Sequence, residues 1–316
     1  MDGSSPGNTL PERRSAKPVR IEFDTLTRHN RLGRRAAAER QLHSDRTFRV
    51  LVGTGRGCTL HGNSMPPMVI VPLRRNVRLS DGESVRMLRP GQLHVAEGGH
   101  SLQAVGTGGA LWIAFVAPPS VWRQLFDAST ERATADPVLL PATHLANRVM
   151  RRAVVRAARE AARAASGKFD ATTAVIRFAT LLAELQSAFD PLVKRCPGRT
   201  LAQRRSVFLR LQRVYNRIES TSDLDLGVSA FARVANYSTC HFVRTFNLVY
   251  GATPYSLIME RRLKQALHLV HESELSITEV ARASGFEDRC AFARSFKRRY
   301  GTTATAARSQ ATGIAV

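Results

Sequence analysis

The sequence predicts an α+β protein of two domains, in which a strand-rich N-terminal part precedes a C-terminal part made of helices. Three observations lead to this fold class. The chain has 316 residues, more than one ordinary core accommodates. Between Phe48 and Pro118, short apolar runs alternate with Gly and Pro turns, which is typical of strands. After Pro118 the turn residues become sparse, and alanine-rich stretches with helical spacing follow.

Composition and charge narrow the class of protein. The chain is 43% hydrophobic and 23% charged, which excludes a wholly disordered polypeptide. No apolar run is long enough to span a membrane and no apolar segment follows the N-terminus, so we expect a cytoplasmic protein without a membrane partner. The four cysteines lack CxxC spacing, which disfavours a disulfide framework and a structural zinc site. The excess of 47 Lys+Arg over 25 Asp+Glu indicates a polyanionic partner or, equally, an Arg-rich proteome.

The first predicted domain covers residues 21–190 and follows a polar segment, residues 1–20, that we expect to be a flexible arm. Its strands are short and closely spaced, which favours a sandwich or small barrel over a parallel sheet. Turn pairs such as Asp81-Gly82 and Pro90-Gly91 separate them. The predicted strands are Phe48–Val52, Met68–Leu73, Ser84–Leu88, Leu93–Ala96, Ser101–Val105 and Leu111–Val116.

Helices complete this first domain. Val121–Ala128 is a short amphipathic candidate. Two longer helices, His144–Ala165 and Ala171–Phe189, are separated by Ser166-Gly167, and Asp170 is placed to cap the second. They predict a helical hairpin that either packs on the strands or forms a dimer interface.

The second predicted domain, residues 200–316, lies beyond a proline-containing linker at residues 191–199 and contains an internal repeat. A segment of phenylalanines and an arginine recurs after 50 residues, and its upstream part recurs after 49. The matched pairs are His241–Phe246 with Ala291–Phe296, Tyr250-Gly251 with Tyr300-Gly301, Ala232 with Ala281, and Tyr237 with Phe286. The duplication therefore covers a whole structural unit.

Each repeat predicts a helix-turn-helix unit. A short helix, Ser229–Val234 or Thr278–Ala283, precedes a turn and a second helix, which Ser238 or Asp288 is placed to cap. The expected core residues are Tyr237, Phe242, Phe246, Phe286, Phe292 and Phe296. The second helix of such a unit can enter the DNA major groove. Tyr255–Val270 predicts a rigid helix between the units, which would place the two recognition helices roughly 10 bp apart.

These motifs identify a resemblance to a known family. Residues 200–308 resemble the C-terminal DNA-binding domain of AraC/XylS-type bacterial transcription regulators. The motifs that carry the resemblance are Gly251-Ala252-Thr253-Pro254-Tyr255, Arg262-Leu263-Lys264-Gln265-Ala266, Ser276-Ile277-Thr278-Glu279-Val280-Ala281, Gly285-Phe286 and Phe296-Lys297-Arg298-Arg299-Tyr300-Gly301. Through Glu83–Gly91, residues 45–190 resemble the cupin-like barrel with helical hairpin that often precedes this domain. The resemblance thus implies an N-terminal cupin-like sensing or dimerisation domain and a C-terminal double helix-turn-helix.

The resemblance also implies roles for single residues. Base contacts fall on Cys240, Val243, Arg244, Arg289, Cys290, Ala291 and Arg294. Contacts to the DNA backbone fall on Ser238, Thr239, Lys297 and Arg298. Arg244 is the strongest candidate for a bidentate bond to guanine, with a phosphate contact as the alternative. This chain departs from the family pattern at Ala304, Ala307-Arg308 and the acidic pair Glu287-Asp288, so the closing helix and the second unit are expected to differ.

The expected function is a sequence-specific transcription regulator, activator or repressor, controlled by an effector or by dimerisation. Its partners by this resemblance are promoter double-stranded DNA, RNA polymerase, a small-molecule effector and a second copy of the chain. No Walker loop, zincin motif or Gly-x-Ser-x-Gly elbow occurs, so we expect no enzyme activity and no cofactor. Two alternatives stay open: a cupin-type metal enzyme with an accessory DNA-binding tail, and an architectural DNA binder without sequence preference.

Four further groups of residues have a functional and a structural interpretation. Cys240 and Cys290 form a redox switch or are small residues tolerated at the groove face. Four histidines either bind a metal or are exposed or hydrogen-bonded side chains, and their scattered spacing favours the second interpretation: His43, His61, His94 and His100. Trp112, Phe115 and Met65–Met68 line an effector pocket or are core. The arginines Arg148, Arg151, Arg152, Arg156, Arg159 and Arg163 form a solvated helix face or contact DNA.

Overall fold

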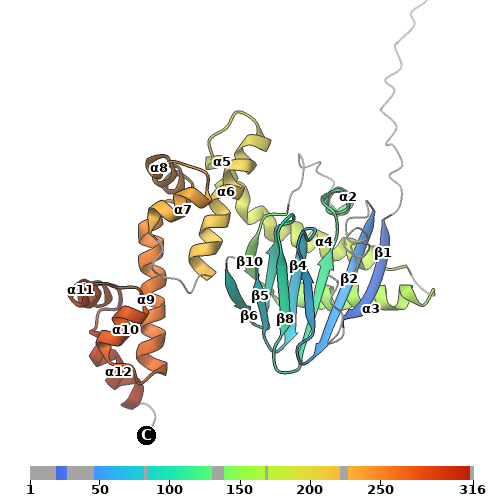
Figure 1. Cartoon of the computed structure of the whole chain (residues 1–316). Helices are drawn as coiled ribbons and strands as arrows, with labels where there is room; N and C mark the ends of the chain where they lie inside the picture. The colour runs from blue at the N-terminus through green and yellow to red at the C-terminus, as the bar shows by residue number, and fades with distance from the viewer. Residues whose placement is uncertain are drawn as a thin grey trace, which may run out of the picture.

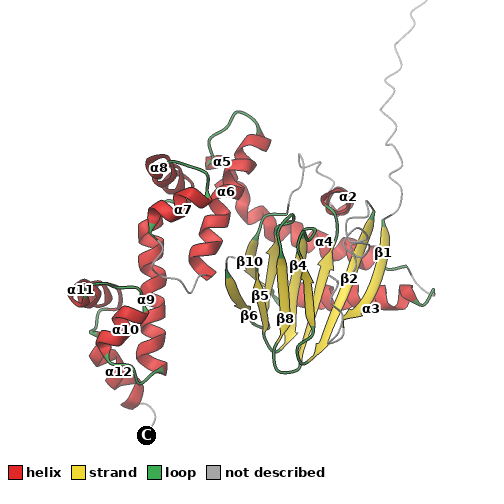
Figure 2. Ribbon diagram, in the orientation of Figure 1, coloured by secondary structure: helices red, strands yellow, loops and turns green. Residues whose placement is uncertain are grey.

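The chain divides into a strand-rich region and a helical region that lie side by side (Figure 1). The structure is a computed structural model and describes residues 19–26, 46–81, 84–129, 139–167, 170–220 and 227–313. Figure 2 shows the strands gathered in the N-terminal region and helices alone in the C-terminal region. The predicted α+β class is therefore confirmed at this level.

The described residues of the N-terminal region contain ten strands. They are β1 (Arg20–Leu26), β2 (Thr47–Gly55), β3 (Thr59–Gly62), β4 (Met68–Arg74), β5 (Val77–Ser80), β6 (Val85–Leu88), β7 (Gln92–Ala96), β8 (Leu102–Gly106), β9 (Ala110–Val116) and β10 (Ala142–Leu145). All six predicted strands are confirmed, while β1, β3, β5 and β10 had no counterpart in the prediction. The segment predicted as an arm, residues 1–20, lies outside the described residues except at its end, where β1 begins at Arg20.

The strands form two sheets. A six-stranded sheet has the order β1-β2-β9-β4-β7-β10, and a four-stranded sheet has the order β3-β8-β5-β6. Among the described residues no strand ladder joins the two sheets, so the predicted barrel is not closed by hydrogen bonds. The two sheets instead meet through side chains, because the larger sheet is apolar on both of its faces.

The space between the sheets is filled by side chains. Trp112 and Met68 are fully buried there, together with Met65 at 1% exposure. A Cβ atom added to Gly53 would lie 2.2 Å from the Trp112 ring, so this glycine is required for the close approach of the indole. Trp112 and the segment Met65–Met68 therefore belong to the core, as their structural interpretation predicted.

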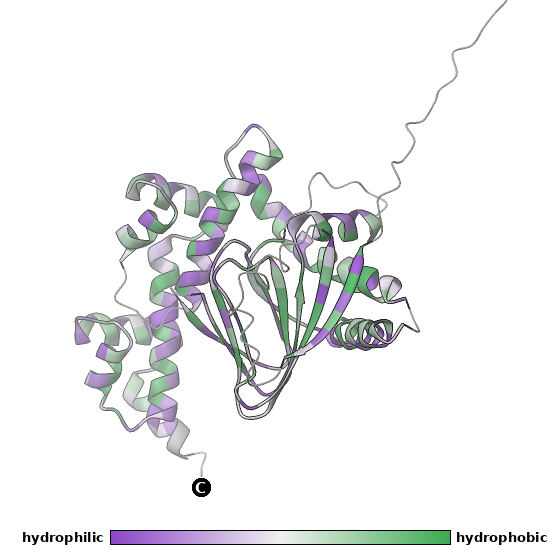
Figure 3. Ribbon diagram, turned by 45° about the vertical axis from the view of Figure 1, so that its right-hand side comes forward, coloured by the Kyte–Doolittle hydropathy of each residue, from purple (hydrophilic) through white to green (hydrophobic). Residues whose placement is uncertain are grey.

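Helices cover the opposite face of the six-stranded sheet. They are α2 (Pro119–Ser129), α3 (Arg148–Ala165) and α4 (Thr172–Gln186), which η1 (Ser187–Phe189) extends. Phe115 of the sheet stacks on Phe178 of α4 with ring centroids 4.2 Å apart. Figure 3 shows apolar residues along the strands that these helices cover. The hairpin thus packs on the sheet, as one of the two predicted arrangements requires.

The structure corrects the start of the first hairpin helix. The prediction placed it at His144, but residues Ala142–Leu145 pair with β7 as strand β10. The helix begins only after Asn147, whose side chain accepts a hydrogen bond from the Met150 N–H at 2.9 Å. Strand pairing across 49 residues, such as Thr143 opposite His94, decides this segment. At the second helix the N-cap is Ala171, one residue after the predicted cap Asp170, whose Oδ1 accepts from the Thr172 N–H at 2.9 Å.

The segment predicted as a linker is partly helical. Helix α5 (Asp190–Arg195) occupies its first half, with Pro191 in the first turn, where a missing N–H costs nothing. The Arg195 guanidinium donates to the Val249 carbonyl at 3.3 Å. The ring centroids of Phe189 and Phe208 are 5.4 Å apart. This stretch is therefore packed on the helices that follow it.

Among the described residues, seven further helices form the C-terminal region. They are α6 (Leu201–Ser220), α7 (Val228–Val234), α8 (Thr239–Tyr250), α9 (Pro254–Glu272), α10 (Ile277–Ala283), α11 (Arg289–Tyr300) and α12 (Ala304–Gly313). They enclose two separate apolar cores, one around Phe242 and Phe246 and one around Phe292 and Phe296. The long helix α9 contributes Ile258 to the first core and Val270 to the second (Figure 1). The predicted helix between the units is thereby confirmed.

Candidate nucleic-acid interface

Each repeat folds as a helix-turn-helix unit, α7 with α8 and α10 with α11. The two turns have the same geometry. The Tyr237 N–H donates to the Ala232 carbonyl at 3.0 Å, and the Phe286 N–H donates to the Ala281 carbonyl at 3.0 Å. The residue before each aromatic anchor has a positive φ, 60° at Asn236 and 79° at Gly285. Such a backbone favours Asn or Gly, which explains these residue types in both turns.

The extra residue of the second unit is Glu287, which lies between the aromatic anchor and the helix cap. In the first unit Tyr237 is followed directly by the cap Ser238. Because the turns themselves are equivalent, the insertion changes only how the chain enters α11. This explains why the repeat spacing changes from 49 to 50 residues at this point.

The two recognition helices are capped as predicted, but with different strength. Ser238 Oγ accepts from the His241 N–H at 3.4 Å. The Asp288 carboxylate accepts from the N–H groups of Cys290 and Ala291, each at 2.9 Å. These two backbone hydrogen bonds lower the pKa of Asp288. The negative charge of Asp288 is therefore directed at the start of α11, where the helix dipole favours it.

Both recognition helices end at a glycine in the left-handed conformation. Gly251 has a φ of 70° and Gly301 a φ of 75°, and each N–H donates back to the helix at 2.8 Å. A residue with a Cβ is strained at such a φ, so the repeated Tyr-Gly pair fixes the helix length. Figure 1 shows α8 near the upper end of α9 and α11 beside α9 lower down.

Most of the residues expected to contact bases are exposed. Cys240 and Arg244 lie on the open face of α8, where the Arg244 Nη2 is 3.6 Å from the Cys240 Sγ. Arg289, Cys290 and Arg294 are likewise exposed on α11. Ala291 is half-buried, and Val243 packs partly against the first core. Val243 therefore offers less surface to a groove than its neighbours.

The residues expected to contact phosphates, Ser238, Thr239, Lys297 and Arg298, are all exposed. Sequence reasoning missed one member of the same face, Leu248, which is 58% exposed. Leu248 follows Cys240 and Arg244 at intervals of four residues, and its repeat counterpart is Arg298. The regular spacing could have identified it.

The relative placement of the units depends on α9. Glu260 on α9 pairs with Lys264 at 3.3 Å and with Arg299 of α11 at 3.6 Å. The Arg261 Nε donates to the Glu219 carbonyl at the end of α6, at 3.2 Å. These contacts join α9 to α6 and to the second unit, in addition to its apolar contacts with both cores.

The remaining candidates are placed as follows. Cys240 and Cys290 are exposed, whereas Cys58 and Cys196 are buried. His43 lies outside the described residues, and the described part of the chain contains no group of three or more side chains suited to hold a metal. The arginines of α3 are all exposed, opposite a buried face of alanine, Val154 and Met150, so they form a charged outer face of that helix. None of the described helices is long and apolar enough to span a membrane.

Comparison with known proteins matches the C-terminal region. The family model described as "Helix-turn-helix domain" matches residues 231–310. The virulence regulon transcriptional activator VirF of Yersinia enterocolitica is 36% identical over 81 residues, 26% of this chain and 30% of that protein. The HTH-type transcriptional regulator ExsA of Pseudomonas aeruginosa is 35% identical over 81 residues, 26% of this chain and 29% of that protein.

Among solved structures, the C-terminal domain of the two-component response regulator yesN from Fusobacterium nucleatum is 26% identical. The match covers 31% of this chain and 95% of that one, with a TM-score of 0.29. The chain thus spans about 30% of the length of the curated relatives named above. Residues 231–310 of this chain are an AraC-type helix-turn-helix domain.

Proposed function

We propose that the protein is a sequence-specific, DNA-binding transcription regulator that reads two neighbouring major-groove segments with α8 and α11. The observation that carries this proposal is the duplicated unit. Two recognition helices with the same turn and the same C-terminal glycine are joined by one helix, α9, to which both cores are packed. Such a pair is suited to two half-elements on one face of the duplex, about one helical turn apart.

In this proposal the exposed residues at the start and middle of each helix contact the bases. Arg244 and Arg294 occupy equivalent positions, and each guanidinium is exposed and long enough to reach a guanine edge. Cys240, Arg289, Cys290 and Ala291 lie beside them, with Val243 at the margin. Ser238, Thr239, Lys297 and Arg298 are assigned to the phosphates, where they fix the register.

The N-terminal region is assigned the control of this activity. We place the sensing or dimerisation domain at residues 21–190, after an arm at 1–20, and the DNA-binding domain at 200–316, with 191–199 between them. The cupin-like assignment rests on the two facing sheets and the helical hairpin packed on one of them. An effector, a second copy of the chain, and RNA polymerase at a promoter are the partners that this assignment requires, and the cytoplasm is the compartment.

Selection of genomic fragments by the purified full-length protein tests the proposal. The selection is done at near-physiological salt, because phosphate contacts alone hold any duplex at low salt. Footprinting of the recovered fragments should show two half-elements about one helical turn apart. Fragments that share no motif, with similar affinity for any duplex, would instead support an architectural DNA binder. Tightly bound metal in the purified protein would support the cupin-type metal enzyme.

A further inference from the structure

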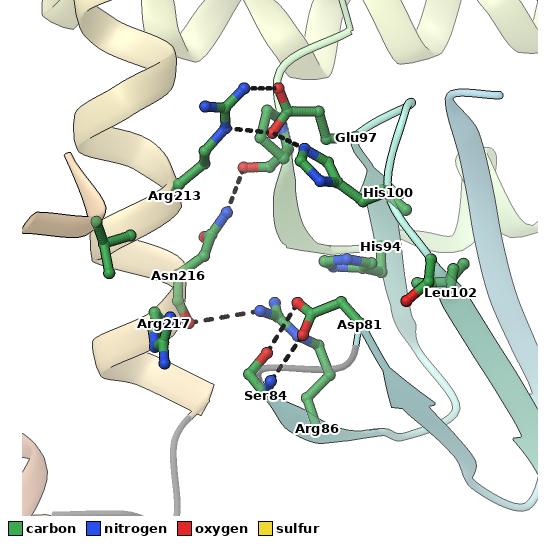
Figure 4. A pocket seen from close by; sticks show the side chains of 14 residues that line it. Asp81, Ser84, Arg86, His94, Glu97, His100, Leu102, Arg213, Asn216 and Arg217 are labelled. Carbon is green, nitrogen blue, oxygen red and sulfur yellow. Dashed lines mark hydrogen bonds and ion pairs between the residues drawn. The ribbon is translucent and has the colours of Figure 1, made fainter. Parts of the chain in front are cut away.

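A cavity of about 310 Å³ lies between the strand-rich region and the C-terminal helices (Figure 4). Strands β6, β7 and β8 supply one wall through Arg86, His94 and Leu102. Helix α6 supplies the opposite wall through Asn216 and Arg217, and Val234 at the end of α7 adjoins them. The volume falls at the lower end of the range of about 300 to 1,000 Å³ that small-molecule sites occupy.

The carboxylates around the cavity are already engaged by protein donors. Glu97 accepts two hydrogen bonds from the Arg213 guanidinium, at 2.7 and 2.5 Å. Asp81 accepts from the backbone N–H and the hydroxyl of Ser84, at 2.7 and 2.9 Å. Each acid of the described lining is thus satisfied within its own wall or across the interface.

Arg86 differs from these paired groups. Its Nη2 donates two long hydrogen bonds, to the Asn216 carbonyl at 3.4 Å and to the Ser220 hydroxyl at 3.2 Å. Within the described residues its Nε and Nη1 have no hydrogen-bond acceptor, and no carboxylate lies within ion-pair distance of the guanidinium. Burial lowers the pKa of Arg86, and the negative charge of Asp81 raises it by a smaller amount. Among the described residues, Arg86 is thus a cation that burial has partly removed from water and that no carboxylate pairs, which suits a ligand that supplies an anionic group.

The surroundings of Arg86 add a second cation and a neutral ring. Arg217 lines the same cavity from the opposite wall, so each wall of the cavity carries an arginine (Figure 4). His94 is 6% exposed, and its Nδ1 lies 3.0 Å from the Thr143 hydroxyl. Burial, together with the charges of Arg86 and His144, lowers the pKa of His94 well below its usual value. The imidazole is therefore neutral at pH 7, and the arginines supply the positive charge.

We propose that this cavity binds a small organic anion, whose carboxylate or phosphate group is held by the Arg86 guanidinium. Two parallel N–H donors of a guanidinium match the two oxygens of such a group. The walls come from the sheets on one side and from α6 and α7 on the other, and α7 belongs to the first helix-turn-helix unit. A bound anion therefore stabilises the docking of that unit on the N-terminal region. The inference deepens the proposed function by naming the chemical class of its effector, and it rests on that function for the consequence at DNA.

Anion binding is tested on the full chain without DNA. Succinate, citrate, glycerol 3-phosphate and inorganic phosphate are titrated at constant ionic strength, with thermal unfolding and calorimetry as readouts. Succinamide, which has the shape of succinate without its charge, is the neutral control. We expect at least one anion to raise Tm in a saturable manner while succinamide and chloride do not. A response to succinate or citrate alone identifies a carboxylate ligand. A response to glycerol 3-phosphate or inorganic phosphate alone identifies a phosphate ligand.

Variants locate the site. Arg86→Gln should weaken binding of the active anion at least tenfold, and Arg86→Lys, which keeps the charge but not the fork, should weaken it as well. Arg89→Gln is the matched control, because Arg89 is exposed just after the same strand and does not line the cavity. Circular dichroism checks that each variant is folded. If Arg86→Gln does not fold, Arg86→Lys is used to locate the site.

Two results overturn the inference: no saturable stabilisation by any of the four anions, or equal binding by the Arg86 and Arg89 variants. Specific DNA affinity of the anion-free protein is measured in parallel. Specific DNA binding without anion binding refutes only the anion site. Anion binding by a protein that shows no preference among duplexes refutes only the regulatory function and leaves the site in place.

Discussion

Replacement of Arg244 by Ala isolates one contact of the proposed interface. The Arg244 Nη2 lies 3.6 Å from the Cys240 Sγ, and the side chain is exposed on α8. Its removal leaves no buried group without a partner, so we expect the free energy of unfolding to change by less than about 0.5 kcal/mol. A bidentate bond to guanine contributes about 1 to 3 kcal/mol of discrimination, which is roughly a 5- to 150-fold loss of affinity.

The measurement is fluorescence anisotropy with the selected site and with a scrambled duplex, each across a series of salt concentrations. Arg151→Ala is the matched control, because it removes the same charge from the exposed face of α3, on the N-terminal region. We expect Arg244→Ala to weaken binding to the selected site alone and to relax the preference at one base pair. Equal loss on both duplexes, with a salt slope reduced by about one, would refute base recognition and assign Arg244 to a phosphate.

Three further predictions concern stability. The free energy of unfolding should fall as pH drops from 6.5 toward about 4, because burial lowers the pKa of His144 to about 4 and keeps it neutral in the folded state, while the unfolded chain takes up the proton. Urea unfolding at several pH values measures this, and a His144→Gln variant should show a flatter dependence. Gly53→Ala should cost about 1 to 3 kcal/mol, since its Cβ would meet the Trp112 ring, whereas Gly227→Ala, with open space around the added atom, should cost less. A loss that is equal in both glycine variants would contradict the packing between the sheets. Phe292→Ala should cost about 3 to 5 kcal/mol, because Phe292 is fully buried in the second core. Hydrogen exchange should then show protection lost in α10 to α12 and kept in α7 and α8; uniform loss would show that the two cores unfold as one.

The helix-turn-helix units could be predicted from the sequence because their signals are local. A capping residue, two phenylalanines four positions apart and a terminal glycine define α8 and α11 within a few residues of chain. Strand β10 could not be predicted in this way. Residues Ala142–Leu145 precede a strongly helical stretch, and only their pairing with β7 makes them a strand. The cavity at Arg86 was equally out of reach, because Arg86 meets Asn216 across 130 residues of sequence.

The two units share a fold but present different helix starts to DNA. At α11 the Asp288 carboxylate occupies two backbone N–H groups at 2.9 Å, whereas at α8 the Ser238 hydroxyl makes one hydrogen bond of 3.4 Å. Helix N-termini attract phosphate through such N–H groups, so they are more available in the first unit. The second unit instead carries Lys297, Arg298 and Arg299 in its last turn. We therefore expect the first unit to hold its phosphates by backbone donors and to fix the register for Arg244, while the second supplies more of the affinity that salt weakens.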